Sequence, residues 1–382
     1  MKKLIMEEFA EFECIGGECP DTCCAGWKVI IDEKSKRNYL AVEGPFGEEL
    51  RKSIKTDERG ISYFDMQKDA RCPFLNENNL CRVYRTLGPE AMCDTCQNYP
   101  RVVYQAGDIL FAAISISCPE AGQLILGKTE KQQYAFDDDP SEINSATEDW
   151  SAFNEAIRAY TTIHGILQER DFFVRERLAT MIVYAYQMQE LINKKEPTAS
   201  LVQLFGDAEQ YAPVIGQVLE GKRAIAEKIR FVRIYVNALL MTARIPTLIS
   251  EFHKIVEYLA NASDNTDEIW QDAFRTFDEN VQETEQEQLL VYFLFRHFME
   301  KYKERSVWES SLFILMFYSA YRCLTVMHYM SEREFPGFEW RILMIARMSR
   351  QFEHSAGVWE AVYANMRENG MDQPGFLLRL VN

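Results

Sequence analysis

The chain has 382 residues, 47% of them hydrophobic, so it is long enough to form two domains with buried cores. Its 58 acidic and 42 basic residues give a formal net charge of −16, which argues against nucleic acid as a general partner because phosphate binding needs a basic surface. Glu7 and Glu8 interrupt the opening residues before an apolar stretch can form, so we expect no secretion signal and a cytoplasmic protein.

Nine of the ten cysteines lie between positions 14 and 118. Disulfides are rare in the cytoplasm, so this density of thiols predicts metal binding rather than a disulfide framework. No histidine precedes His164, so a metal held here would be bound by thiolates, which select zinc or iron–sulfur clusters. The nine candidate ligands are Cys14, Cys19, Cys23, Cys24, Cys72, Cys81, Cys93, Cys96 and Cys118.

The cysteine spacing favours iron over zinc. Only Cys93 and Cys96 form the C-x2-C knuckle that is typical of zinc sites. The adjacent Cys23 and Cys24 diverge too much for one tetrahedral ion, whereas a larger cluster or two neighbouring sites would accept them. Three of the cysteines precede proline, as does the last cysteine of the bacterial ferredoxin run. We therefore predict a [4Fe–4S] cluster, with zinc as the alternative and the choice between one site and two left open.

The first 130 residues predict a small α+β module around these cysteines. Its expected elements are short strands at 27–32 and 61–64, a helix at 80–87 ended by Gly88-Pro89, a short helix that carries Cys93 and Cys96 on one face, and a hairpin of 101–104 with 109–117.

An acidic, turn-rich stretch at 131–150 predicts a linker, and the pattern from 151 to 382 is helical. The expected fold is thus a small α+β cysteine-rich metal-binding module followed by a larger all-α domain, mainly α overall. The apolar run 311–330 is long enough to cross a bilayer, but Arg322 lies near its middle, where a charge is costly. We predict a buried core helix there and no membrane partner.

Several motifs of the first part resemble the flagellin lysine-N-methylases, the FliB-type family with a cysteine-rich zinc- or iron-chelating module. The resemblance covers about residues 10–125 at motif level and, more loosely, the helical remainder. The motifs that carry it lie at 12–27, 72–75, 80–84, 92–101 and 117–121.

This resemblance implies methyl transfer from S-adenosylmethionine to lysine side chains of flagellin, with an iron–sulfur cluster in the cysteine module. The residues themselves carry no Gly-x-Gly-x-x-Gly signature opening a βαβ unit. Cys19 and Cys23 fit the C-x3-C-x2-C triplet of radical enzymes that use this methyl donor, but the third position is Gly26.

Polar residues near the cysteines are the candidates for chemistry. Tyr84, Tyr99 and Tyr104 are candidates to orient the lysine amine, and core aromatic residues are the alternative. Arg101 is a candidate to pair with the donor's carboxylate, and a surface salt bridge is the alternative. A non-enzymatic zinc- or iron-binding module, with the helical domain as an adaptor, is the second hypothesis for the whole chain. The oligomeric state is left open.

Overall fold

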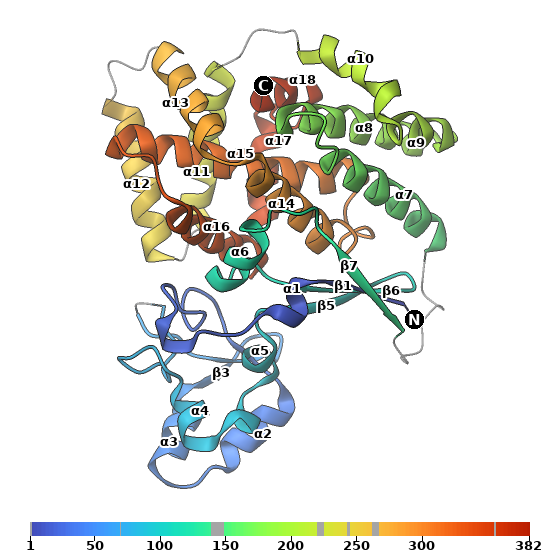
Figure 1. The fold of residues 1–382 in the computed structure, drawn as a ribbon. Coiled ribbons are helices and arrows are strands. Elements are labelled where there is room, and N and C mark those ends of the chain that lie inside the picture. The colour runs from blue at the N-terminus through green and yellow to red at the C-terminus, as the bar shows by residue number, and fades with distance from the viewer. Residues whose placement is uncertain are drawn as a thin grey trace.

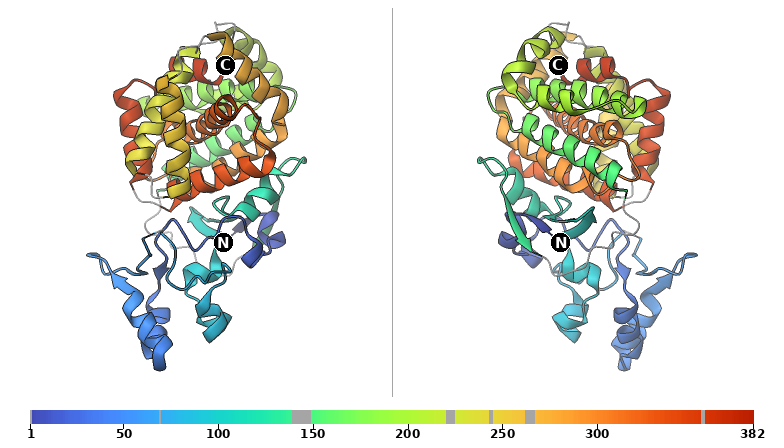
Figure 2. Two further views of the ribbon diagram at one scale, coloured as in Figure 1. Left: turned by 90° about the vertical axis from the view of Figure 1, so that its left-hand side faces the viewer. Right: turned by 90° about the vertical axis from the view of Figure 1, so that its right-hand side faces the viewer.

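The computed structural model describes residues 2–68, 70–138, 149–219, 225–242, 245–261, 267–354 and 357–382. Over these ranges the chain is mainly helical with a small α+β part near the N-terminus, as predicted. Figure 1 shows the helices on one side of a four-stranded sheet and the cysteine-rich part on the other. The two side views of Figure 2 show the same order of layers.

The four-stranded sheet has the strand order β5-β6-β1-β7. The predicted hairpin is confirmed as β5 (Arg101–Ala106) and β6 (Ile109–Ile114), which pair antiparallel. Strand β1 (Lys2–Met6) pairs in parallel with β6, and β7 (Tyr134–Asp138) pairs antiparallel with β1. Neither β1 nor β7 was predicted. Strand β7 occupies part of the stretch expected to be a linker, and residues 139–148 of that stretch lie outside the described residues.

Residues between β1 and β5 form the cysteine-rich part, which contains a second sheet in the order β2-β4-β3. The predicted strand at 27–32 is reduced to two residues, because Gly26 has a φ of +87° and the Trp27 indole N–H donates to the Cys23 carbonyl oxygen at 2.7 Å. The predicted helix at 80–87 is present as α4, and its chain exits at Gly88 with a φ of +88°. The elements of this part are α1 (Glu8–Glu11), β2 (Ile30–Ile31), α2 (Glu33–Ala41), α3 (Gly44–Ser53), β3 (Ile54–Thr56), β4 (Ser62–Phe64), α4 (Arg82–Leu87) and α5 (Asp94–Asn98), with 3-10 turns at Gly16–Glu18 and Pro89–Ala91.

Helices fill the rest of the described chain. Asp149 begins the first long one by accepting hydrogen bonds from the backbone of Ser151 and Ala152, which have no partner within the helix. The helices are α6 (Pro119–Leu126), α7 (Trp150–Leu167), α8 (Val174–Lys194), α9 (Ala199–Phe205), α10 (Ala208–Leu219), α11 (Ile225–Thr242), α12 (Pro246–Asn261), α13 (Asp267–Asn280), α14 (Glu283–Phe293), a π-helix (Leu294–Phe298), α15 (Val307–Glu332), α16 (Phe338–Glu353), α17 (Val358–Glu368) and α18 (Pro374–Val381).

Helix α15 contains the apolar run that was predicted to be a core helix. By length and composition it is the one helix in the described ranges that could cross a membrane, but its most apolar 18-residue window is 100% buried inside the protein. Arg322 is accommodated there by Asp278, 2.7 Å from its Nη2, and by the rings of Phe274 and Phe277. The apolar character of α15 therefore serves the core of the helical half.

Two hydrophobic cores hold the described chain together. The smaller one lies in the cysteine-rich part and is made of Val29, Ile31, Tyr39, Leu50, Phe64, Cys72, Phe74, Val83 and Cys93. The larger one joins the helices to the four-stranded sheet through residues such as Met6, Phe111 and Ile114. The sheet thus shares its core with the helical half, and the division into domains at 131–150 stays a prediction.

Candidate active site

The nine clustered cysteines separate into two groups, according to which thiols affect one another's pKa. Cys118 interacts electrostatically with Cys19, Cys14 and Cys23, so these four make up what we call the first thiol group. Burial, together with the nearby Cys19 and Cys14, raises the pKa of Cys118 to about 11. Cys14 is exposed and Cys118 is buried, so this group reaches from the surface to the sheet.

The second thiol group consists of Cys24, Cys72, Cys81, Cys93 and Cys96. Its members interact electrostatically with one another and sit in or against the smaller core. Burial raises the pKa of Cys72 to about 12, and Cys24, Cys81 and Cys93 add to that rise. Cys93 precedes α5 and Cys96 lies in it, and their thiols share a hydrogen bond, so they face the same way as predicted.

The vicinal pair Cys23 and Cys24 joins the two groups, with one thiol in each. A hydrogen bond from the Cys23 thiol lowers the pKa of Cys24 to about 7 against the opposing effect of burial. The same bond raises the pKa of Cys23. Because the two thiols share a hydrogen bond they lie together, and the divergence expected from their adjacent positions in the sequence is wrong.

The chemistry of the donor atoms fits a thiolate-bound metal or cluster. All ten cysteines are free thiols. In the described ranges, no three cysteine, histidine or acidic side chains already stand at positions that could hold one ion together.

Arg350 of α16 holds the loops of the first thiol group against the helical half. Its buried guanidinium donates to the carbonyl oxygen of Ser117 at 3.0 Å and to those of Thr22 and Ala25 at 3.3 and 3.4 Å. These carbonyls flank Cys23-Cys24 and Cys118. Gly26 completes the contact, because a Cβ there would lie 3.1 Å from Ile245, and its positive φ is one that L side chains rarely adopt.

The three predicted tyrosines lie in different environments. Tyr84 is 53% exposed on α4, in the part of the module away from the helical half (Figure 1). Tyr104 stacks on Phe111 and donates its hydroxyl to the carbonyl oxygen of Phe295, so it is bound into the larger core. Tyr99 lies beside Trp27 and His354, with ring centroids 5.5 and 6.0 Å away. Only Tyr99 lies next to the first thiol group, and burial raises its pKa.

Arg101 lies within the fold. Its Nε and Nη2 donate to the carbonyl oxygens of Phe9 and Phe12 at 3.1 and 2.9 Å, and its guanidinium stacks over both rings. It thereby fixes the chain between β1 and Cys14.

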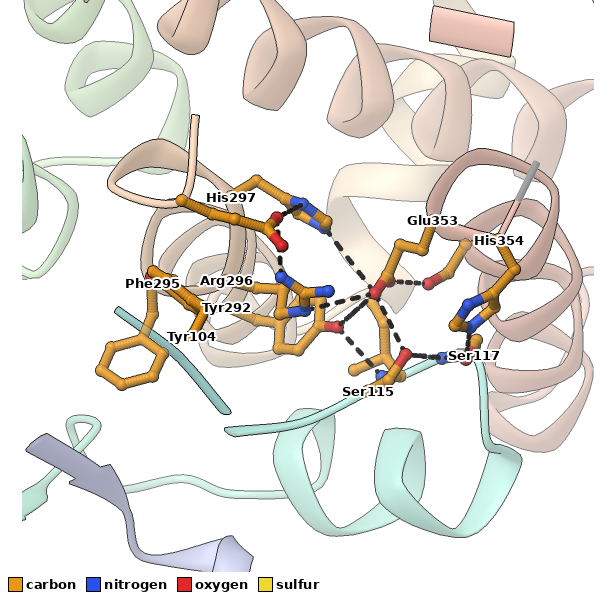
Figure 3. Close-up of polar contacts among 12 residues, drawn as sticks. Tyr104, Ser115, Ser117, Tyr292, Phe295, Arg296, His297, Glu353 and His354 are labelled. Atoms are coloured by element: carbon orange, nitrogen blue, oxygen red, sulfur yellow. Dashed lines mark hydrogen bonds and ion pairs between the residues drawn. The ribbon is translucent and has the colours of Figure 1, made fainter. Parts of the chain in front are cut away.

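A buried polar network runs from Ser117 into the helical half (Figure 3). The Ser117 hydroxyl bonds the Tyr99 hydroxyl at 3.0 Å, His354 Nε2 at 2.9 Å and the Ser115 hydroxyl at 2.7 Å. Ser115 in turn donates to the Glu353 carboxylate at 3.1 Å. The serines follow β6 and the Glu353-His354 pair ends α16, so the network connects the sheet to the helices directly beside Cys118.

Opposite charges stabilise the buried carboxylate of Glu353. Tyr292 donates to it at 3.1 Å, and Arg296 and His297 of the π-helix lie 3.6 and 3.7 Å from it. Burial alone would raise the pKa of Glu353, but His297 and Arg296 hold that pKa well below its usual range. Burial lowers the pKa of His354 to about 4 although Glu353 opposes this, so its imidazole is neutral near pH 7.

An open cavity of about 720 Å³, which we call the interface cleft, lies between the cysteine-rich part and the helical half. Trp27, Lys28 and Tyr63 line one side of it, and Arg305, His354 and Trp359 line the other. The Trp27 and His354 rings lie 4.6 Å apart, so the neutral imidazole of the network also lines the cleft. The cleft is therefore adjacent to both the network and the first thiol group.

The polar residues of α16 were not predicted from the sequence. Arg350 lies three residues after Arg347, and Glu353 and His354 lie three and four residues after Arg350, which places a polar stripe along one face of the helix. This polar stripe is the sequence pattern from which these residues could have been predicted. Their partners lie more than 230 residues earlier in the chain, so local pattern alone could not match them.

Comparisons with known proteins identify relatives of the chain. A family model described as the FliB lysine N-methylase C-terminal domain matches residues 160–380, which include α16. The flagellar biosynthetic protein FliU of Salmonella muenchen is 31% identical over 134 residues, which cover 33% of this chain and 79% of FliU. Lysine-N-methylases of Salmonella typhimurium and Salmonella choleraesuis are also 31% identical over 134 residues, which cover 33% of this chain and 33% of each relative.

No solved structure matches the chain. The alignment spans about a third of the length of the two lysine-N-methylases. The family model, by contrast, extends over more than half of the present chain. The chain therefore belongs to the FliB lysine N-methylase family.

Proposed function

We propose that the chain is a protein-lysine N-methyltransferase that transfers the methyl group of S-adenosylmethionine to lysine side chains of flagellin. The family membership and the relatives named lysine-N-methylase support the reaction. The relative named as a flagellar biosynthetic protein supports a substrate from the flagellum. The observation that carries the proposal is the neutral His354 of the family domain, which lines a cleft beside a group of four thiols.

The first thiol group is the proposed site of a [4Fe–4S] cluster. Its four sulfur atoms match the four thiolates that such a cluster needs, and the cleft lies next to it. When bound, the cluster would place a charged iron–sulfur centre beside the cleft. The second thiol group lies in the smaller core and serves as a structural metal site, with zinc as the alternative metal.

The chain's own residues prepare the lysine for attack. A lysine ammonium must lose a proton before its Nζ lone pair can form the bond to the methyl carbon. The methyl–sulfur bond breaks at the same time, and its electron pair stays on sulfur to give S-adenosylhomocysteine. The neutral His354 accepts the ammonium proton at Nδ1, while its Nε2–H donates to Ser117.

Burial makes His354 a weak base, and the carboxylate of the network behind it partly offsets that effect. A positive imidazolium is stabilised by the buried Glu353 carboxylate, which His354 reaches through Ser117 and Ser115. Tyr99 fixes the orientation of the Ser117 hydroxyl. The aromatic walls of the cleft reduce the contact of an entering lysine with water, which lowers the pKa of that lysine.

We place this activity in the cytoplasm, because ten unpaired thiols suit a reducing compartment. The test is to co-express flagellin with the full chain in a bacterium without such a methylase, and to map methyl-lysine by mass spectrometry. Wild type and Cys323→Ser should methylate flagellin, because Cys323 lies in α15 away from both thiol groups, whereas Cys118→Ser should not. Unmodified flagellin beside iron-loaded wild-type protein would instead support a non-enzymatic metal-binding adaptor.

A further inference from the structure

The interface cleft has the size and the walls of a small-molecule site. Its volume of about 720 Å³ lies within the range of roughly 300–1,000 Å³ that is typical of ligand pockets. One wall comes from the cysteine-rich part and the other from α16, α17 and the segment before α15. A ligand bound there would contact both parts at once.

Basic side chains outnumber acidic ones in the lining of the cleft, whereas acidic residues outnumber basic ones in the whole chain. The chain carries 58 acidic and 42 basic residues, but among the described residues the cleft is lined by the cations Lys28, Arg59, Lys301 and Arg305 and by the acids Asp57, Glu353 and Glu360. The side chain of Glu353 is 0% exposed and is bound in the network, so four cations face two accessible carboxylates. A ligand with a carboxylate is therefore favoured over one that carries only an ammonium group.

Arg305 is the cation best placed to bind that carboxylate. Its side chain is 14% exposed, and its guanidinium is held over the rings of Phe313 and Trp359, 5.2 Å from each centroid. Its pairing with Glu360 is long, at 4.0 Å, and the Glu360 side chain is 68% exposed. A guanidinium fixed in this way offers a planar pair of donors to an incoming carboxylate.

Trp27 provides a flat apolar wall that is attached to the first thiol group. Its indole N–H donates to the carbonyl oxygen of Cys23 at 2.7 Å, which fixes the ring at the boundary between the cleft and the thiols. An aromatic base gains binding affinity by stacking on an aromatic side chain such as an indole. The cleft thus combines a stacking surface, a carboxylate partner and two acids for an ammonium group.

We propose that the interface cleft is the binding site for S-adenosylmethionine, with the adenine against Trp27 and the amino-acid carboxylate on Arg305. This inference rests on the proposed function, since it places the methyl donor of that reaction. The adenosyl group then lies against the wall that Cys23 anchors, and His354 lies on the opposite wall, with its ring 4.6 Å from that of Trp27, for the lysine. The bound methyl donor would therefore contact residues of both the cysteine-rich part and the helical half.

Isothermal titration calorimetry on the full chain, purified without oxygen, tests the placement with S-adenosylhomocysteine and adenosine as probes. Arg305→Gln should weaken S-adenosylhomocysteine binding by about 10- to 100-fold, the range expected for a lost charge-assisted hydrogen bond, and leave adenosine binding unchanged. Trp27→Leu should weaken both probes by about tenfold or more. Lys301→Gln is a second cleft variant at a partly exposed position, for the case that Trp27→Leu does not fold.

Two matched controls lie away from the cleft. Arg275→Gln removes a cation that pairs with Asp272 in its own helix, and Trp150→Leu removes an indole at the start of α7; both should bind like wild type. If wild type binds and all three cleft variants keep its Kd, the placement is wrong while the methyltransferase proposal stands. Equal losses for both probes in Arg305→Gln would show that Arg305 does not hold the carboxylate. A wild-type chain that binds neither probe would overturn the use of this methyl donor altogether.

Discussion

The Nη2 atom of Arg350 donates to the carbonyl oxygen of Ser117 at 3.0 Å, one residue before Cys118. The same side chain reaches the loop around Cys23 and Cys24. One arginine of the helical half therefore holds both stretches that supply the first thiol group. The polar network shares Ser117 with this connection, and its His354 also lines the interface cleft.

Replacing Arg350 should loosen the connection strongly. Arg350→Met leaves three carbonyl oxygens without their donor, which should lower the free energy of unfolding by about 3 kcal/mol. Arg347→Met is the matched control: Arg347 is partly exposed and pairs with Asp21 alone at 3.0 Å, so its loss should cost less than about 1 kcal/mol. Urea unfolding followed by fluorescence measures both. Equal decreases in the free energy of unfolding for the two variants would mean that Arg350 does not hold the cysteine-rich part against the helical half.

The three tyrosines should respond differently to removal of the hydroxyl group. Tyr99→Phe takes one partner from Ser117, so it should lower kcat more than it raises KM and cost about 1 kcal/mol of stability. Tyr104→Phe should cost a similar amount of stability and leave kcat unchanged, because its hydroxyl bonds a backbone carbonyl in the core. Exposed Tyr84→Phe should change neither. Loss of kcat in Tyr84→Phe with normal kinetics in Tyr99→Phe would reverse these roles.

Stability should fall as the pH drops below 6.5. Burial lowers the pKa of both His164 and His354 from 6.5 to about 4. Between these pH values the unfolded chain binds about two more protons than the folded chain, so acid favours unfolding. Urea midpoints should decrease as the pH is lowered across this range. His354→Gln should remove about half of the pH dependence of stability that the two histidines cause. A flat profile in wild type would show that these imidazoles are not buried as described.

Cysteine replacements should separate the two thiol groups. Cys118→Ser should lose the iron and its brown colour with a modest change in melting temperature. Cys93→Ser should instead give protease-sensitive protein, because Cys93 is fully buried in the smaller core. Cys323→Ser is the control and should keep both iron and stability. Identical iron loss in Cys118→Ser and Cys93→Ser, with no difference in protease sensitivity, would argue for a single shared site.

Local signals in the sequence predicted the local structure well. The hairpin of β5 and β6 is fixed by its turn at Gly107-Asp108, and α4 ends where Gly88 adopts a positive φ. The amphipathic and apolar periods likewise predicted the helices, including the buried α15. Each of these features depends on residues close together in the chain.

Features that depend on distant partners were missed. Strand β1 was not recognised because its neighbour β6 lies more than a hundred residues later, and parallel pairing leaves no turn signal. Ser117 and His354 are 237 residues apart, so their hydrogen bond appears only in the folded chain. The cysteines were found because nine of them lie in one stretch, but their division into two groups arises from how the loops pack.

The most direct test of the account is reconstitution from purified components. Flagellin, the iron-loaded chain and S-adenosylmethionine with an isotopically labelled methyl group are incubated without oxygen, and intact flagellin is analysed by mass spectrometry. The account predicts a mass increase in whole methyl units, with the label on lysine Nζ and its loss in Cys118→Ser. Unlabelled flagellin after incubation with folded, iron-loaded wild-type protein would contradict it.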